Sequence, residues 1–289
     1  MDNDDYAGFS DNASFDEEAL GEVYNRGLQL ENEGDLAGAI EAYRQALEID
    51  PADHCGITIR LVAMGKGEAP EKMPDAYVAT LFDQHAEDFD EILVDRLGYC
   101  VPLLLSDALK IHAPGPYARG LDLGCGTGLS GVALVDLCGA MTGVDLSERM
   151  VEIAFDREVY EDLYTGEVVD FLEEFEEEDD NRPTWDLIVA TDVFPYLGAI
   201  EAIVSGAADR LNAGGVFAFS TETLEDAAFA DQPYILGPSR RYAQKAAYVR
   251  DTLTTHGFTV LTMEDITVRA EKGEPVPGHL VIARKGFKE

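Results

Sequence analysis

A glycine-rich run is the segment of this sequence whose residue types and spacing are best suited to chemistry. It reads Leu121-Asp122-Leu123-Gly124-Cys125-Gly126-Thr127-Gly128-Leu129-Ser130-Gly131 and joins a predicted strand to a predicted helix. Glycines are needed where a chain turns tightly and a ligand lies against bare backbone, while the free amides of the following helix attract negative charge. The spacing Gly126-x-Gly128-x-x-Gly131 also matches the dinucleotide fingerprint. The run therefore predicts a nucleotide-type cofactor, and two kinds are compatible with it.

Two acidic residues bear on which cofactor binds. Asp122 lies two residues before the first glycine, where a carboxylate would repel a pyrophosphate but suits an ammonium group. S-adenosylmethionine carries such a group together with a cationic sulfonium. Asp145 ends the next predicted strand, about 20 residues further on, where it could accept hydrogen bonds from both ribose hydroxyls. NAD enzymes use the same device, so an NAD(P)-dependent oxidoreductase stays open as an alternative.

Four runs resemble the motifs of class I S-adenosylmethionine-dependent methyltransferases. Residues 121–128 and the run Gly143-Val144-Asp145-Leu146-Ser147-Glu148-Arg149-Met150 are similar to motifs one and two of that family. Residues 185–192 resemble its fourth-strand motif, and residues 211–215 resemble its turn into strand five. Residues 75–289, together with the preceding repeat, further resemble a group of bacterial proteins, predicted to be methyltransferases, with an N-terminal tetratricopeptide segment.

The resemblance implies roles for individual residues around S-adenosylmethionine. The glycine turn would face the methionine end, Asp122 its amino group and Asp145 the ribose. Asp192, just after the fourth strand, would lie where methyl transfer takes place, although it could instead cap the next helix. The remaining implied cofactor contacts are Gly124, Cys125 as a small filler, Gly126 and Gly128 in the turn, Leu146, Glu167 and Val168 around the adenine, and Phe82 near the sulfonium.

A segment before the glycine run could cover the cofactor and contribute to catalysis. Residues 77–90 have the pattern of an amphipathic helix, which in related methyltransferases closes over the cofactor. This would bring Phe82, His85 and Phe89 near the sulfonium, although the two phenylalanines could equally be core residues. His85 is a candidate general base because an imidazole titrates near neutrality.

A second segment, residues 237–245, is the densest basic cluster of the sequence. It predicts a small anionic acceptor such as a carboxylate or phosphate, bound by Arg240, Arg241 and Tyr242, with Tyr242 also a catalytic candidate. The alternative is that both arginines pair with surplus surface carboxylates. The fourth-strand run continues Asp192-Val193-Phe194-Pro195-Tyr196, which places Tyr196 at the acceptor site and lacks the Asn-Pro-Pro-Tyr of enzymes that methylate exocyclic or amide nitrogens.

The elements that must position these residues alternate between strands and helices from residue 75 onward. Strands are predicted at 119–123, 140–145, 163–167, 185–190, 215–220, 259–268 and 280–283. This alternation indicates an α/β fold, a Rossmann-like doubly wound, mostly parallel seven-stranded sheet. A turn at residues 271–278 would join the last two strands into an antiparallel hairpin at one edge.

The N-terminal part of the chain has a different organisation. Residues 1–16 are predicted to be a disordered acidic tail, residues 17–70 a small all-α segment, and residues 75–289 the methyltransferase domain. Gly27, Ala39, Tyr43, Ala46 and Pro51 fit one 34-residue tetratricopeptide (TPR) repeat. One repeat cannot bury its apolar face, so it either packs on the catalytic domain or presents a groove for a protein partner or a second copy.

Composition excludes several partners. The 289 residues contain 57 Asp and Glu against 21 Lys and Arg, a formal charge of −36. Nucleic acids and anionic membranes would repel such a surface, which leaves a small-molecule substrate, a protein partner, or a non-catalytic scaffold that binds the cofactor. The four cysteines have no metal-ligand spacing, and no targeting or membrane segment is visible. We therefore expect no metal and a cytoplasmic location.

Overall fold

A seven-stranded sheet forms the centre of the protein. The structure, a computed structural model, describes residues 15–177 and 181–287, so most of the expected acidic tail lies outside the described residues. The strand order is β3-β2-β1-β4-β5-β9-β8. The strands are β1 (Tyr117–Leu123), β2 (Cys138–Asp145), β3 (Asp162–Thr165), β4 (Trp185–Ala190), β5 (Leu211–Glu222), β8 (Phe258–Glu271) and β9 (Glu274–Lys285). The first five pair in parallel and β9 is antiparallel to both β5 and β8, which confirms the predicted fold.

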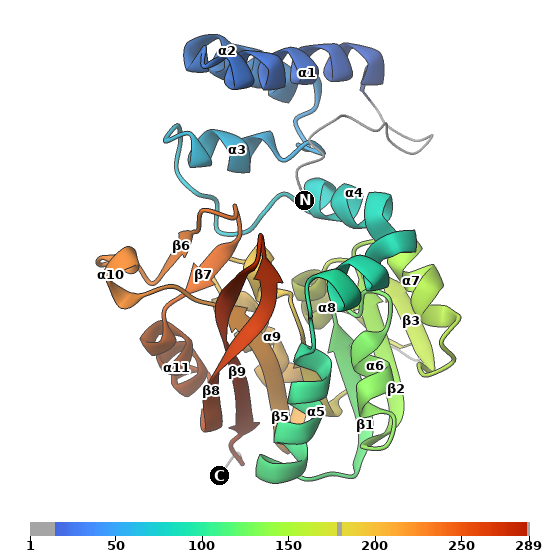
Figure 1. The fold of residues 1–289 in the computed structure, drawn as a ribbon. Coiled ribbons are helices and arrows are strands. Elements are labelled where there is room, and N and C mark those ends of the chain that lie inside the picture. The colour runs from blue at the N-terminus through green and yellow to red at the C-terminus, as the bar shows by residue number, and fades with distance from the viewer. Residues whose placement is uncertain (1–14, 178–180, 288–289) are drawn as a thin grey trace.

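Helices cover both faces of this sheet (Figure 1). One face buries apolar side chains of α5 (Val101–His112) and α6 (Leu129–Leu134). The other buries those of α8 (Val168–Glu174), α9 (Glu201–Arg210) and α11 (Ala246–Thr255). A further helix, α7 (Glu148–Phe155), contacts β2 and β3. The strands buried on both faces are near-continuous apolar runs, as a doubly wound sheet requires.

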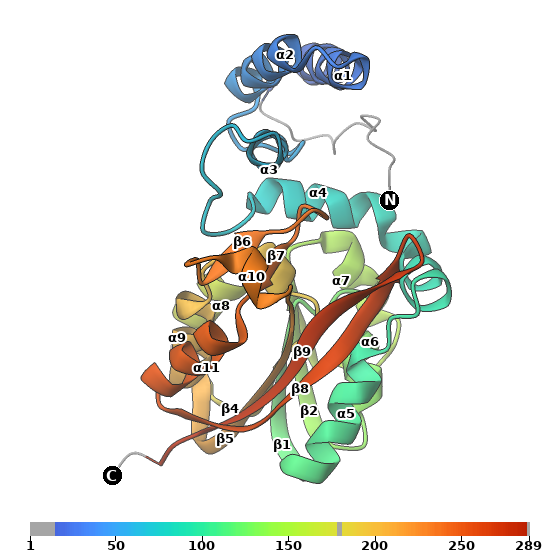
Figure 2. The ribbon, with the colours of Figure 1, turned by 60° about the vertical axis from the view of Figure 1, so that its left-hand side comes forward.

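The C-terminal hairpin is longer than the sequence suggested, and the predicted eight-residue turn is wrong. The strands β8 and β9 pair as far as Glu271 and Glu274, so Lys272 and Gly273 alone make the turn, with φ of 51° and 85°. Positive φ at both positions is the geometry of a tight hairpin turn. Pro275 and Pro277 lie beyond the ladder with β5, so their missing N–H groups cost no hydrogen bond of that ladder, and the Pro277 carbonyl accepts one of 3.0 Å from the Thr223 amide. Figure 2 shows this twisted hairpin extending past the other strands.

A small two-stranded sheet was not anticipated by the sequence. It pairs β6 (Tyr234–Leu236) with β7 (Tyr242–Gln244), and it follows the short helix α10 (Asp226–Phe229). The predicted basic loop is therefore largely the connection between these two strands. Tyr242 becomes a strand residue that is fully buried.

The N-terminal helices stack above the carboxyl ends of the parallel strands (Figures 1 and 2). The helical hairpin of α1 (Glu17–Glu33) and α2 (Leu36–Ile49) turns at Gly34, whose φ is 83°. Gly27 lies against the Tyr43 ring, where a Cβ would be 2.4 Å from Cε1. The next helix, α3 (Ile57–Ala63), contributes Ile57 to the apolar core of this hairpin. No helix in the described part of the chain is long and apolar enough to span a bilayer.

A covering segment follows α3 and differs in form from the single predicted helix. It consists of α4 (Asp75–His85), a 3₁₀ turn η1 (Ala86–Asp88) and a π-helical turn η2 (Glu91–Arg96). Two aspartates attach it to the sheet domain. The Asp83 carboxylate accepts a 2.5 Å hydrogen bond from the Ser147 hydroxyl, and Asp90 accepts one of 2.5 Å from Thr127.

Candidate active site

A cavity lies beneath this covering segment, at the carboxyl ends of the parallel strands. This is the position at which doubly wound sheets bind ligands. Of the residues proposed from sequence, those lining it are Phe82, Gly124, Cys125, Gly126, Asp145, Leu146, Glu167, Val168, Asp192 and Tyr196. Those not among its lining are His85, Asp122, Gly128, Arg240, Arg241 and Tyr242.

The glycine turn forms the floor of the cavity. Gly124 has a φ of 66°, and a Cβ there would lie 2.4 Å from Cγ2 of Val193. At Gly126, which lines the cavity with a φ of 53°, a Cβ would meet nothing within 4 Å. The turn therefore needs glycine for its backbone conformation, and it leaves bare backbone facing an open space.

Asp145 is held beside this turn by two backbone amides. Its Oδ2 accepts a 2.8 Å hydrogen bond from the Gly126 amide, and its Oδ1 accepts one of 2.9 Å from the Ser147 amide. Burial raises its pKa to about 6, although these hydrogen bonds act in the opposite direction. Each carboxylate oxygen retains a lone pair for a ligand hydroxyl.

Glu167 lies at the start of α8 rather than at the end of the third strand, because β3 already ends at Thr165. Its Oε2 accepts hydrogen bonds of 2.7 and 2.8 Å from the amides of Val169 and Asp170, which fixes the side chain as a helix cap. Oε1 lies 3.6 Å from Nζ of Lys72 and keeps capacity to accept a hydrogen bond. Lys72, which the sequence analysis missed, also pairs with Asp75 at 2.9 Å.

Asp122 is buried below the turn instead of facing the cavity. Its Oδ2 accepts a 2.6 Å hydrogen bond from the Tyr160 hydroxyl, which in turn accepts one of 3.1 Å from the Gly131 amide. Burial raises the pKa of Asp122 to about 7. In this structure the carboxylate supports the start of α6 through Tyr160 and is not among the residues that line the cavity.

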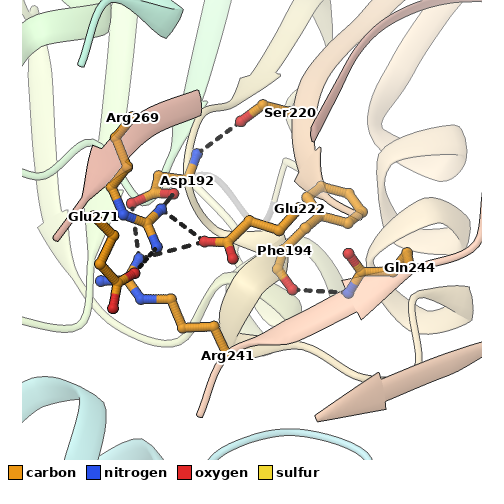
Figure 3. A network of polar contacts seen from close by, with 8 residues as sticks. All are labelled: Asp192, Phe194, Ser220, Glu222, Arg241, Gln244, Arg269 and Glu271. Carbon is orange, nitrogen blue, oxygen red and sulfur yellow. Dashed lines mark hydrogen bonds and ion pairs between the residues drawn. The ribbon is translucent and has the colours of Figure 1, made fainter. Parts of the chain in front are cut away.

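A network of charged side chains lies behind Asp192 (Figure 3). Asp192 has a φ of 60°, and its amide donates a 3.1 Å hydrogen bond to the Ser220 hydroxyl. Its Oδ2 lies 3.4 Å from Nη1 of Arg241. Its Oδ1 lies 3.7 Å from Nη1 of Arg269, which is 2.7 Å from Oε1 of Glu222. Tertiary packing thus gathers into one cluster ions from the loop after β4, the end of β5, the residue before β7, and β8.

The predicted basic patch is neutralised by this cluster. Arg241 lies 3.7 Å from Glu222, and its guanidinium lies over the Tyr196 ring at 5.3 Å. The two carboxylates that pair with Arg241 are mostly buried, at 13% and 6% side-chain exposure, so Arg241 does not pair with surface carboxylates. Arg240, with a φ of 58°, lies in the turn between β6 and β7. Tyr242 donates a 2.5 Å hydrogen bond to the Pro70 carbonyl, a structural contact away from the cavity.

The covering segment brings aromatic rings to the cavity but not an imidazole. Phe82 and Phe89 both line it, with ring centroids 5.8 Å apart, and Phe82 lies 5.4 Å from the Tyr196 ring. His85 ends α4, outside the lining. The sequence analysis missed Tyr99 and Thr191, which also line the cavity, and Glu222 and Arg269 behind it. Thr191 directly follows β4, and Glu222 is the last residue of β5. Their positions at the carboxyl ends of parallel strands could have identified both as site residues from the sequence.

Comparison with known proteins places this site in a family. Residues 121–217 match the family model "Methyltransferase domain", and residues 22–53 match "Tetratricopeptide repeat". Residues 121–217 therefore belong to a methyltransferase domain, and a TPR repeat precedes it. A ubiquinone biosynthesis O-methyltransferase of Xanthomonas campestris is 28% identical over 123 residues, which cover 43% of this chain and 50% of that protein. The chain therefore spans about half the length of the curated relatives it matches.

Solved structures agree with the fold of the methyltransferase domain. An S-adenosylmethionine-dependent methyltransferase from Clostridium acetobutylicum gives a TM-score of 0.51 at 16% identity, covering 71% of this chain and 99% of that one. A structure of the Haloferax volcanii Trm112 methyltransferase activator with a putative methyltransferase gives 0.54 at 19% identity, covering 71% and 98%. At these identities the likeness shows the fold alone.

The charges of the cavity fit S-adenosylmethionine, the cofactor of this family. In the described part of the chain, the cavity lining contains one basic side chain, Lys72, and four carboxylates. The carboxylates are those of Asp75, Asp145, Glu167 and Asp192. A cofactor with sulfonium and ammonium cations is attracted by such a lining, whereas the two phosphates of a dinucleotide are repelled. The site therefore disfavours the NAD(P)-dependent alternative.

Proposed function

We propose that this protein transfers a methyl group from S-adenosylmethionine to a small-molecule acceptor. The observation that carries the proposal is the acidic cavity at the carboxyl ends of the strands, with the glycine turn beside Asp145. In this proposal Asp145 accepts hydrogen bonds from the ribose, and Glu167 accepts one from the adenine through Oε1. The glycine turn supports the methionine end.

The cofactor supplies an already activated methyl group, so the protein chiefly has to orient the reactants and exclude water. Phe82 and Phe89 form an aromatic roof over the cavity. The Asp83–Ser147 and Asp90–Thr127 hydrogen bonds hold that roof against the sheet domain. Asp192, two residues after β4, lines the cavity where the acceptor would bind in this proposal.

Calorimetric titration of the full chain tests this proposal. We expect S-adenosylmethionine and S-adenosylhomocysteine to bind in the micromolar range, and NAD and NADP not to bind. The protein is first checked by mass spectrometry for copurified ligand. Binding of a dinucleotide, or of none of the four without a copurified ligand, would contradict the proposal. Cofactor binding without turnover of any acceptor would instead support a cofactor-binding scaffold.

For the TPR segment we propose a role in bracing the cavity roof. Ile59 of α3 packs in an apolar cluster with Met73, Val78 and Tyr196. These three partners of Ile59 also line the cavity. The following linker is tied down as well, because the Glu71 carbonyl accepts hydrogen bonds of 2.7 and 2.9 Å from the amides of Gly198 and Ala199. A protein partner or second copy docked on α1 and α2 could act through the same contacts.

Two matched substitutions on α3 test the bracing role. Ile57 and Ile59 are both 1% exposed, but Ile57 faces the helical hairpin and Ile59 faces the roof. I59A is expected to weaken S-adenosylhomocysteine binding by about two- to fivefold, because a loosened roof lowers the binding-competent fraction. I57A should leave the affinity unchanged. Equal affinities for both variants, measured by calorimetry, would exclude the bracing role.

We also propose a reducing compartment, the cytoplasm, as the location. The four cysteines Cys55, Cys100, Cys125 and Cys138 are all free thiols. The formal charge of −36 supports a small molecule, rather than a nucleic acid or an anionic membrane, as the substrate.

A further inference from the structure

The charged network behind Asp192 has more carboxylates than cations. Asp192, Glu222 and Glu271 supply three negative charges, while Arg241 and Arg269 supply two positive charges. Arg269 is 2% exposed and is engaged by all three carboxylates, with Glu271 at 3.5 Å. Both guanidiniums are therefore compensated before any ligand enters.

The cavity in front of this network is mostly apolar. Phe89, Leu93, Val193 and Tyr196 line it, and Asp192 brings a carboxylate into that lining. The Oδ1 atom of Asp192 accepts no hydrogen bond in the described part of the chain, although it is buried. Its nearest partner is Nη1 of Arg269 at 3.7 Å, an ion pair that is too long for a hydrogen bond, so the Asp192 carboxylate keeps capacity to accept one.

We propose that the methyl acceptor is a neutral hydroxyl compound with an apolar body, and that Asp192 takes the hydroxyl proton. This inference rests on the proposed methyl transfer and replaces the anionic acceptor expected from the sequence. In the step, the acceptor oxygen forms a bond to the methyl carbon while the carbon–sulfur bond breaks. The electron pair of that bond stays on sulfur, the proton passes to the Asp192 carboxylate, and the products are a methyl ether and S-adenosylhomocysteine.

Electrostatics favours a hydroxyl over other acceptors. An anionic acceptor would meet a net negative wall whose arginines are already paired. An amine beside Asp192 would be held as an ammonium ion, whose nitrogen has no lone pair for attack. A thiol reacts as a thiolate, which the same negative wall disfavours. A neutral hydroxyl avoids these penalties and supplies a hydrogen-bond donor to the Asp192 carboxylate.

Matched acceptor triplets test the proposed class on the full chain. Each triplet shares one hydroxyl and differs in a neutral, carboxylate or ammonium substituent, for example 4-ethylphenol, 4-hydroxyphenylacetate and tyramine. With S-adenosylmethionine present, we expect S-adenosylhomocysteine formation to favour neutral members over carboxylates by about tenfold or more in kcat/KM. A preference for carboxylates, or no turnover of any neutral hydroxyl by protein that binds the cofactor, would overturn the inference. Failure to bind the cofactor would instead refute the proposed function.

The role of Asp192 is tested separately with the best acceptor found. D192N is expected to lower kcat by about 10²- to 10⁴-fold, the usual contribution of a positioned base. Its S-adenosylhomocysteine affinity should stay within about threefold of wild type, because other residues bind the ribose and adenine. The matched control D251N changes an exposed aspartate on α11 and should leave kcat unaltered. Unchanged kcat in folded D192N would show that Asp192 does not take the proton.

Discussion

Wild-type protein is expected to lose stability as the pH rises from about 4 to 8, because buried Asp122 must ionise. Replacing Asp122 with asparagine is expected to abolish a large part of that loss. Burial raises the pKa of this carboxyl from 3.8 to about 7. The folded state therefore keeps a proton that the unfolded chain releases near pH 4, so stability falls as the pH rises through this interval and the full penalty is present above pH 7. At about 1.4 kcal/mol per pKa unit, the penalty is ~4 kcal/mol at most.

Urea unfolding of wild type and D122N at pH 5 and pH 8 measures this effect. The difference between the two proteins isolates Asp122 from other titrating groups, and D251N serves as an exposed control. The variant should lose much less stability than wild type between the two pH values. If D122N and wild type lose the same stability over that interval, Asp122 is already ionised at pH 5 and the burial argument fails.

Replacing Asp145 with alanine is expected to weaken S-adenosylmethionine binding by about 1–3 kcal/mol, the range for losing hydrogen bonds to a charged group. The wild-type affinity should itself fall as the pH is lowered through about 6, the pKa that burial gives this carboxyl. A protonated carboxyl gives up one of the two acceptors needed by the ribose hydroxyls, so low pH weakens binding.

Calorimetry of wild type and D145A between pH 5 and pH 8 tests both statements. Because Asp145 also accepts from the Gly126 and Ser147 amides, each protein is checked for a native unfolding transition first. The pH dependence should be absent in D145A. An unchanged dissociation constant in the folded variant would remove Asp145 from the cofactor site.

The sequence determined the features that depend on residues close together along the chain. The turn from Gly124 to Gly128 could be predicted because a strand, a glycine cluster and a helix are consecutive, which fixes the loop geometry locally. Asp145 followed from the same logic at the next strand end. The TPR repeat was readable because Gly27 and Tyr43 must meet in any such helical hairpin, as they do here.

Only the tertiary structure decided how distant segments share the site. Arg269 reaches Asp192 because β8 continues past its predicted end, and this extension depends on pairing with β9. The burial of Asp122 depends on Tyr160, which comes from another part of the chain. Sequence patterns report which residues favour a strand or turn, but charge compensation and burial depend on three-dimensional distance. The basic run around Arg241 therefore looked like an anion site until its carboxylate partners were placed beside it.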